Sequence, residues 1–112
     1  TVVKVLDGDT IKLDVAIWLG LTQRISLRLN GVDTPEKRGS PDCEKALAKK
    51  ATEFTRQFVS GGLVVVSNVS LGKYAGRALG SVSVEGKDLV EALISAGHGR
   101  PYDGGARGSW CE

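Results

Sequence analysis

Acidic residues gather at two places in the first third of the sequence, and this arrangement could do chemistry. Asp9 follows an Asp-Gly pair, and Asp33 and Glu36 flank the dipeptide Thr34-Pro35. Both groups come at the ends of predicted strands, where loops present side chains to solvent or ligands. Carboxylate oxygens are hard ligands of the kind that Ca²⁺ and Mg²⁺ prefer. The sequence therefore indicates a cation site, provided that the two segments meet in the fold.

Two arginines strengthen this interpretation. Arg28 stands on the polar face of a predicted strand five residues before Asp33, and Arg77 begins another predicted strand. Taken singly, an Asp-Gly-Asp sequence is commonly a plain turn and a strand arginine is commonly solvated. A guanidinium binds phosphate in a bidentate manner and stabilises the charge of phosphoryl transfer. Carboxylates and arginines would converge at one end of the sheet if the strand of Asp9 lies beside that of Arg28, as phosphodiester hydrolysis requires.

Apolar periodicity predicts the elements that must position these residues. Alternating or β-branched segments predict five strands, at 1–6, 9–16, 23–29, 63–69 and 77–85. A helix is expected from Ser40-Pro41 to about Val59, and a second from Asp88 to Gly97. The order of three strands, helix, two strands and helix favours an α+β fold, mainly β: a five-stranded Greek-key OB-fold barrel with two to three helices.

Several finer expectations concern packing. The stripe Leu47, Ala51, Phe54 and Phe58 is expected to face the core from the first helix. The strand at 63–69 is expected to be buried and the apolar segment 17–21 to form a loop. The tail from His98 has several glycines and lacks clear periodicity. Trp110 is expected to hold this tail against the domain.

Bulk properties narrow the function classes. A chain of 112 residues is expected to form one domain, 1–112. The net charge of +2 is small for a passive nucleic-acid binder. No apolar run approaches the roughly 20 residues that span a bilayer, so no membrane partner is expected. Cys43 and Cys111 can form a disulfide or remain as two thiols, and their spacing does not suit a zinc site.

Four segments, in order along the chain, carry a resemblance to a known family. They are Val5-Leu6-Asp7-Gly8-Asp9-Thr10-Ile11, Arg28-Leu29-Asn30-Gly31-Val32-Asp33-Thr34-Pro35-Glu36, Lys73-Tyr74-Ala75-Gly76-Arg77-Ala78-Leu79 and Leu93-Ile94-Ser95-Ala96-Gly97. With these segments the chain resembles the staphylococcal nuclease (thermonuclease) family over nearly its whole length.

The resemblance implies a calcium-dependent phosphodiesterase. Asp9 and Asp33 would be carboxylate ligands of one Ca²⁺ ion, or of another divalent cation in its place. The backbone carbonyl of Thr34 would add a third protein oxygen. Glu36 would activate the attacking water.

The resemblance also implies roles toward the substrate, which would be DNA, RNA or both. Arg28 and Arg77 would grip the phosphate and stabilise the transition state. Lys73 and Tyr74 would contact a terminal phosphate, and Tyr102 would stack on a base. Cleavage would break the bond to the 5′ oxygen and leave 3′-phosphate ends.

Two other functions compete with the nuclease. One is a catalytically inactive OB-fold module that binds nucleic acid or protein, since a fold does not dictate a function. Such modules lose one or more of the acid and arginine positions, which are all filled here. The other is an interaction protein that works through segment 17–21.

An exported, periplasmic or extracellular monomer is expected, because a non-specific nuclease endangers its host; an intracellular role tied to a plasmid or phage is the alternative. Because the chain begins at Thr1, any export signal is expected to have been removed already.

Overall fold

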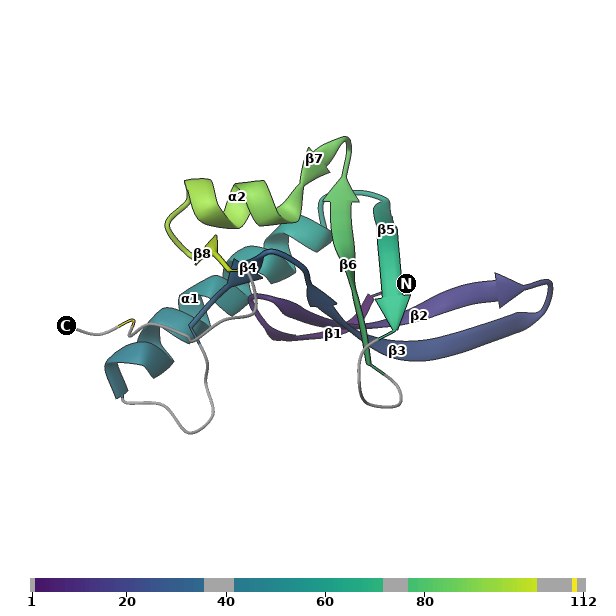
Figure 1. Cartoon of the computed structure of the whole chain (residues 1–112), viewed down its shortest axis with the longest axis horizontal. Helices are drawn as coiled ribbons and strands as arrows, with labels where there is room; N and C mark the ends of the chain where they lie inside the picture. The colour runs from purple at the N-terminus through teal and green to yellow at the C-terminus, as the bar shows by residue number, and fades with distance from the viewer. Residues whose placement is uncertain (1, 36–41, 72–76, 103–109, 111–112) are drawn as a thin grey trace.

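The computed structural model describes residues 2–35, 42–71, 77–102 and 110. These residues form long strands, short strands and two helices (Figure 1). The long strands are β1 (Val2–Asp7), β2 (Thr10–Trp18), β3 (Leu21–Leu29), β5 (Val64–Leu71) and β6 (Arg77–Val84). The short strands are β4 (Val32–Asp33), β7 (Lys87–Asp88) and β8 (Arg100–Pro101), and the helices are α1 (Asp42–Val59) and α2 (Leu89–Ser95). The predicted α+β fold with mainly β content is confirmed.

The five long strands form one sheet in the order β1-β2-β3-β6-β5, and β7 pairs with β6. All neighbours are antiparallel except β3 and β6, which are parallel. The chain leaves the sheet after β3, forms α1, and returns to the far side of the sheet, which is the crossover of a Greek key. Within the described residues no pairing joins β5 to β1, so the sheet is a partly open OB-type barrel. Neither helix in this part of the chain is long and apolar enough to cross a bilayer.

Alternation along the strands builds the core. Its buried apolar residues are Val5, Ile11, Leu13, Leu27, Leu29, Val32, Val59, Ala78, Val82, Leu89 and Leu93. On α1, Ala51 is buried and Phe54 and Phe58 pack against this core as predicted, although Leu47, Phe54 and Phe58 stay half-buried. The deepest positions of α1 are instead small or β-branched: Ala48, Ala51, Thr52, Thr55 and Val59. Small side chains let this helix approach the β1–β2 turn closely, which a stripe of bulky residues would prevent.

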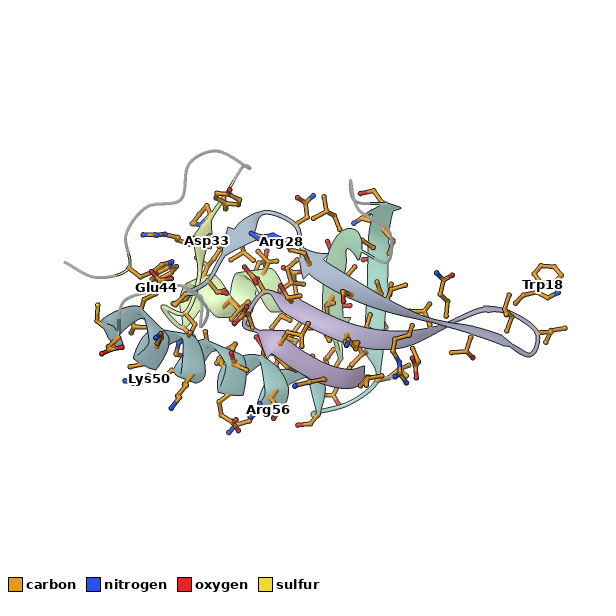
Figure 2. The ribbon with its side chains drawn as sticks, turned by 90° about the horizontal axis from the view of Figure 1, so that it is seen from below. Trp18, Arg28, Asp33, Glu44, Lys50 and Arg56 are labelled. Atoms are coloured by element: carbon orange, nitrogen blue, oxygen red, sulfur yellow. The ribbon has the colours of Figure 1, made fainter. Side chains whose placement is uncertain are left out.

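Two expectations were wrong. Strand β5 is not buried, since Val65 and Val69 are 48% and 51% exposed, because it stands at the end of the sheet with one face outward. The expected loop 17–21 is instead the tip of a hairpin, where β2 continues to Trp18 and β3 begins at Leu21. Gly20 has a φ of +76° in the turn between them, which favours glycine. The hairpin projects beyond the core, and Trp18 lies at its tip, 75% exposed (Figures 1 and 2).

Candidate functional site

The turn between β1 and β2 carries Asp9, and α1 holds this turn in place. Asp7 pairs with Thr10, which leaves Gly8 and Asp9 as the turn residues. The hydroxyl of Thr55 donates a buried hydrogen bond of 2.7 Å to the carbonyl of Gly8. A Cβ on Gly8 would lie 2.9 Å from the Cβ of Ala51, so only glycine permits this approach. The packing buries Asp9, which is 5% exposed.

Strand pairing brings Arg28 to Asp9. Thr10 is the cross-strand partner of Arg28, and the backbone N–H of Leu29 donates to the carbonyl of Asp9 at 2.8 Å. The predicted adjacency of the two strands is therefore confirmed. The Thr10 hydroxyl donates to Oδ1 of Asp9 at 3.0 Å, while Nη1 of Arg28 lies 3.6 Å from Oδ2. This separation exceeds hydrogen-bond length, so Asp9 attracts the Arg28 guanidinium but does not fix its orientation by a hydrogen bond.

A second, two-stranded sheet carries Asp33. Strand β4 pairs with β8, with Asp33 opposite Arg100 and Val32 opposite Pro101. Asp33 is 1% exposed. Its Oδ2 accepts a hydrogen bond from Nε1 of Trp110 at 3.3 Å and lies 3.7 Å from Nη2 of Arg100. The tail from His98 shows no clear periodicity in the sequence, and the two-residue strand β8 is too short to produce one.

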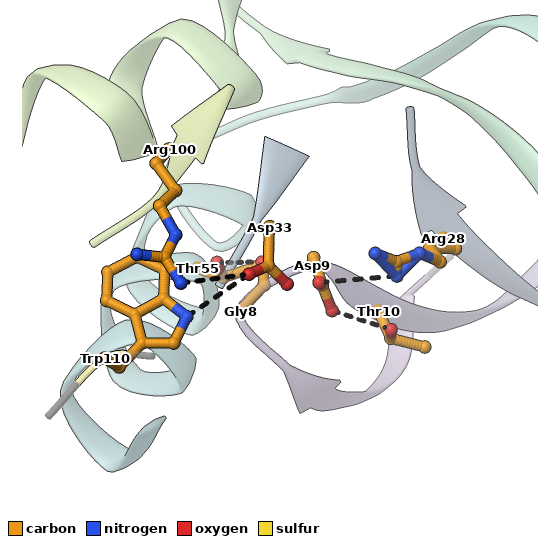
Figure 3. A network of polar contacts seen from close by, with 8 residues as sticks. All are labelled: Gly8, Asp9, Thr10, Arg28, Asp33, Thr55, Arg100 and Trp110. Atoms are coloured by element: carbon orange, nitrogen blue, oxygen red, sulfur yellow. Dashed lines mark hydrogen bonds and ion pairs between the residues drawn. The ribbon is translucent and has the colours of Figure 1, made fainter. Parts of the chain in front are cut away.

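Figure 3 shows Asp9 and Asp33 as neighbours, and a Cβ on Gly8 would lie 3.2 Å from the Cβ of Thr34, so the segments that carry the two acids are in contact. Trp110 and Arg100 approach Asp33 from the side opposite to Asp9, and Arg28 lies beyond Asp9 (Figure 3). Two buried carboxylates repel one another unless positive charge compensates them. Here each carboxylate has an arginine beside it, and the shared face between the two acids is a place where a cation would be stabilised.

The donor set fits a hard cation in part. Two nearly buried carboxylates, adjacent to the buried Thr34, provide oxygen ligands of the type that Ca²⁺ takes. Among the residues that the structure describes, no group of three or more His, Cys, Asp or Glu side chains is close enough to hold an ion. Glu36 lies outside the described residues. Backbone carbonyls and water would therefore have to complete the coordination.

The structure describes some of the remaining predicted site residues in full, some in part and some not at all. The ring centre of Tyr102 lies 5.6 Å from the Arg28 guanidinium, and its backbone N–H donates to the carbonyl of Gly31 at 3.0 Å. Arg77 is described by its backbone alone, and its Cα pairs with Ser26 in the parallel β3–β6 register. Lys73 and Tyr74 lie outside the described residues. The structure thus brings Tyr102 to the Asp9–Arg28 pair and says nothing of Lys73 and Tyr74.

Three features of this region were not predicted from the sequence. Arg100 was part of an apparently irregular tail, yet its guanidinium lies over the indole of Trp110 at 4.1 Å from the ring centre. Trp110 does hold the tail, as expected, but does so on Asp33 itself. Glu44, in the first turn of α1, is only 8% exposed, and Figure 2 places it at the same end of the molecule as Asp33. No local pattern distinguishes Glu44 from the exposed acids of the same helix.

A second aspartate–arginine pair, on the projecting hairpin, provides a contrast. Nε and Nη2 of Arg24 donate to the two carboxylate oxygens of Asp14 at 2.8 and 3.1 Å. The hydrogen bond from Arg24 lowers the pKa of the Asp14 carboxyl, and the same bond raises the pKa of Arg24. This closed, exposed pair differs from the open Asp9–Arg28 pair, whose guanidinium keeps a looser contact.

Comparison with known proteins identifies the family of the chain. The family model described as "Staphylococcal nuclease homologue" matches residues 26–107. Two Escherichia coli proteins, one from O157:H7, are named "Uncharacterized endonuclease"; each is 29% identical over 103 residues, which cover 91% of this chain and 60% of that protein. "Endonuclease YncB" of Bacillus subtilis (strain 168) is 31% identical over 103 residues, which cover 89% of this chain and 46% of that protein. The chain thus spans about half to three fifths of the length of these relatives. By the span of the family match, the chain belongs to the family of staphylococcal nuclease homologues.

Proposed function

We propose that this chain is the catalytic domain of a metal-dependent nuclease that hydrolyses phosphodiester bonds of DNA or RNA. The observation that carries the proposal is the pair of buried carboxylates, Asp9 and Asp33, that lie side by side with Arg28 next to them. Nη1 of Arg28 and Nη2 of Arg100 lie 3.6 and 3.7 Å from these carboxylates, and a cation between the two acids would stabilise them further.

Asp9, Asp33 and the backbone carbonyl of Thr34 would hold one Ca²⁺ ion, or another divalent cation with the same preference for oxygen. When bound, such an ion neutralises charge on a non-bridging phosphate oxygen and orients the attacking water. The hydroxyl of Thr10, which donates to Oδ1 of Asp9, would fix the orientation of that carboxylate.

Arg28 would bind the phosphate. Its side chain is 27% exposed, and its contact with Asp9 is longer than a hydrogen bond, so its N–H groups can turn to phosphate oxygens at little cost. Arg77, two positions away from Arg28 in the β3–β6 register, would supply the second guanidinium. Glu36, which follows Asp33 by three residues, would take the proton from the attacking water.

Tyr102 would stack on a base beside Arg28, and Lys73 and Tyr74 would contact a terminal phosphate. Cleavage would break the bond to the 5′ oxygen and leave 3′-phosphate ends. The relatives named endonuclease support cutting at internal bonds. Cys43 is disulfide-bonded, which supports action in an oxidising compartment outside the cytosol.

Digestion of single-stranded DNA with and without Ca²⁺ tests the proposal, because the chain offers matched pairs of variants. Asp33→Asn and Arg28→Gln should each lower kcat/KM by at least about a hundredfold, as expected when transition-state charge stabilisation is lost. Asp14→Asn and Arg24→Gln remove the hairpin pair and should leave cleavage near the parent rate. Phosphatase-dependent extension of the products by a polymerase would verify 3′-phosphate ends.

Two results would contradict the proposal. Binding of DNA without cleavage under Ca²⁺, Mg²⁺ or Mn²⁺ would replace the enzyme by a binding module. An equal fall in kcat/KM in the site variants and in the hairpin controls would show a general effect of lost charge that is unrelated to the carboxylate pair.

A further inference from the structure

One oxygen of Asp33 is held by two side chains from the end of the chain. Nε1 of Trp110 donates to Oδ2 at 3.3 Å, and Nη2 of Arg100 lies 3.7 Å from the same atom. The Arg100 guanidinium also stacks on the Trp110 indole, 4.1 Å from the ring centre. The three side chains therefore form one unit, which is termed the Asp33 clamp below.

Backbone pairing places the first member of the Asp33 clamp. Arg100 is the cross-strand partner of Asp33, so its side chain emerges beside that of Asp33. Strand β8 can approach β4 this closely because residue 99 is glycine: a Cβ there would lie 2.7 Å from Cγ2 of Val32. The approach is thus built into the backbone and does not depend on the length of the arginine side chain.

The second member, Trp110, is next to a cysteine in the sequence. Cys43, in the first turn of α1, is disulfide-bonded, and the only other cysteine of the sequence is Cys111, the residue after Trp110. Cys111 itself lies outside the described residues. The sequence thus offers Cys111, one residue after Trp110, as the partner of Cys43.

We propose that Trp110 and Arg100 are positioning residues that set the orientation of the Asp33 carboxylate toward the cation, an inference that rests on the proposed nuclease function. Both hold Oδ2 from the side opposite to Asp9 (Figure 3), so the carboxylate keeps its other edge directed toward Asp9. A ligating carboxylate that is hydrogen-bonded from behind loses less rotational freedom when it binds an ion. Removal of such a partner typically costs about 10- to 100-fold in metal affinity.

Trp110 is the better test residue of the two. Replacing Arg100 would also remove a positive charge near the cation, and the loss of repulsion would oppose the loss of positioning. Trp110→Phe removes only a neutral N–H donor and keeps an aromatic face for Arg100. The chain supplies a matched control, because Trp18, the only other tryptophan, lies at the exposed hairpin tip.

Calorimetric titration of the folded, oxidised protein with Ca²⁺ gives the first measurement. The Kd of Trp110→Phe should rise at least about tenfold, whereas Trp18→Phe should bind as the parent protein does. Asp33→Asn provides the limit in which the ligand itself is lost. Far-UV circular dichroism at the titration temperature shows that each variant is folded, so a weaker Kd reports positioning and not unfolding.

Terbium luminescence gives an independent measurement of proximity. In Trp18→Phe the single indole is Trp110, and excitation that only indole absorbs should sensitise Tb³⁺ bound beside Asp33. Adding Asp33→Asn to this variant should abolish the emission. Excess Ca²⁺ should quench it by competition for the same site.

The outcomes separate the two proposals. A tenfold or larger loss of Ca²⁺ affinity in Trp110→Phe, together with sensitised Tb³⁺ emission, supports the positioning role. If the parent binds Ca²⁺ and Trp110→Phe binds within twofold of it, the positioning role is overturned and the nuclease proposal stands. If the parent binds none of Ca²⁺, Mg²⁺, Mn²⁺ and Tb³⁺, both proposals fall.

Discussion

Thr55 lies on the buried face of α1, and its hydroxyl holds the turn that carries Asp9 in place. The group is 0% exposed and donates a 2.7 Å hydrogen bond to the buried carbonyl of Gly8. Thr55→Val keeps the shape of the side chain but leaves this carbonyl without its donor, which costs about 1–3 kcal/mol. With an unfolding entropy of about 2.1 cal/mol/K per residue, a loss of about 2 kcal/mol lowers Tm by roughly 8 °C in a chain of this size.

Urea unfolding followed by circular dichroism measures this loss. The midpoint should fall while the m-value stays constant, because the surface exposed on unfolding does not change. Thr55→Ser keeps the hydroxyl and loses one buried methyl group, so it should cost only about 1 kcal/mol. Thr22→Val, on the exposed part of β3, is the control for the exchange itself. A midpoint for Thr55→Val equal to that of Thr55→Ser or higher would refute the argument that the hydrogen bond anchors the turn.

Three other predictions concern separate constraints. Gly99→Ala should destabilise by about 1–3 kcal/mol through overpacking, and Val32→Ala in the same chain should recover part of the loss in thermal unfolding; purely additive effects would contradict the contact. Cys43→Ser should lower stability by about 4 kcal/mol in the loop-entropy view, and a reductant should reproduce this shift in the parent but not in the variant. Arg24→Gln should let the pKa of Asp14 rise toward its ordinary value of 3.8 in an NMR titration. Because the pKa of Asp14 is lower in the folded than in the unfolded state, the pair stabilises the folded protein at pH values above the unfolded-state pKa. This contribution is lost as pH falls through the folded-state pKa. An unchanged Asp14 titration in Arg24→Gln would show that the hydrogen bond does not form in solution.

Local sequence patterns were sufficient to predict the strands and helices whose apolar residues recur at regular spacing or whose ends carry capping residues. Alternation in β2 and β3 identified the faces that bury Ile11 and Leu27, and the Asp88–Glu91 spacing identified the start of α2. The side chain of Asp88 accepts from the backbone N–H of Glu91 at 3.0 Å. Gly97, with a φ of +80°, ends that helix as predicted. Each of these signals is contained in a few consecutive residues.

Features decided by distant contacts could not be predicted in this way. Which face of α1 is buried depends on the small turn residue Gly8, more than 40 positions earlier in the chain, because its lack of a side chain admits Ala51 and Thr55. Strand β5 is β-branched in sequence, but its position at the end of the sheet exposes half of it. Arg100 meets Asp33 only because Gly99 lets β8 pair with β4. In each case the outcome depends on a contact between segments that are remote in sequence, so a local pattern carries no information about it.

The charge balance of the site explains how a domain with a net charge of only +2 could act on a polyanion. In the described part of the site, Asp9 and Asp33 face Arg28 and Arg100, so the fixed charges cancel. A bound divalent cation would leave this centre with a net positive charge, at a buried place where screening by salt is weak. Attraction to phosphate would then arise at the catalytic centre, with little contribution from a basic surface. Since the net charge outside this centre is small, binding should weaken only modestly between low and physiological salt, in contrast with a protein that contacts many phosphates.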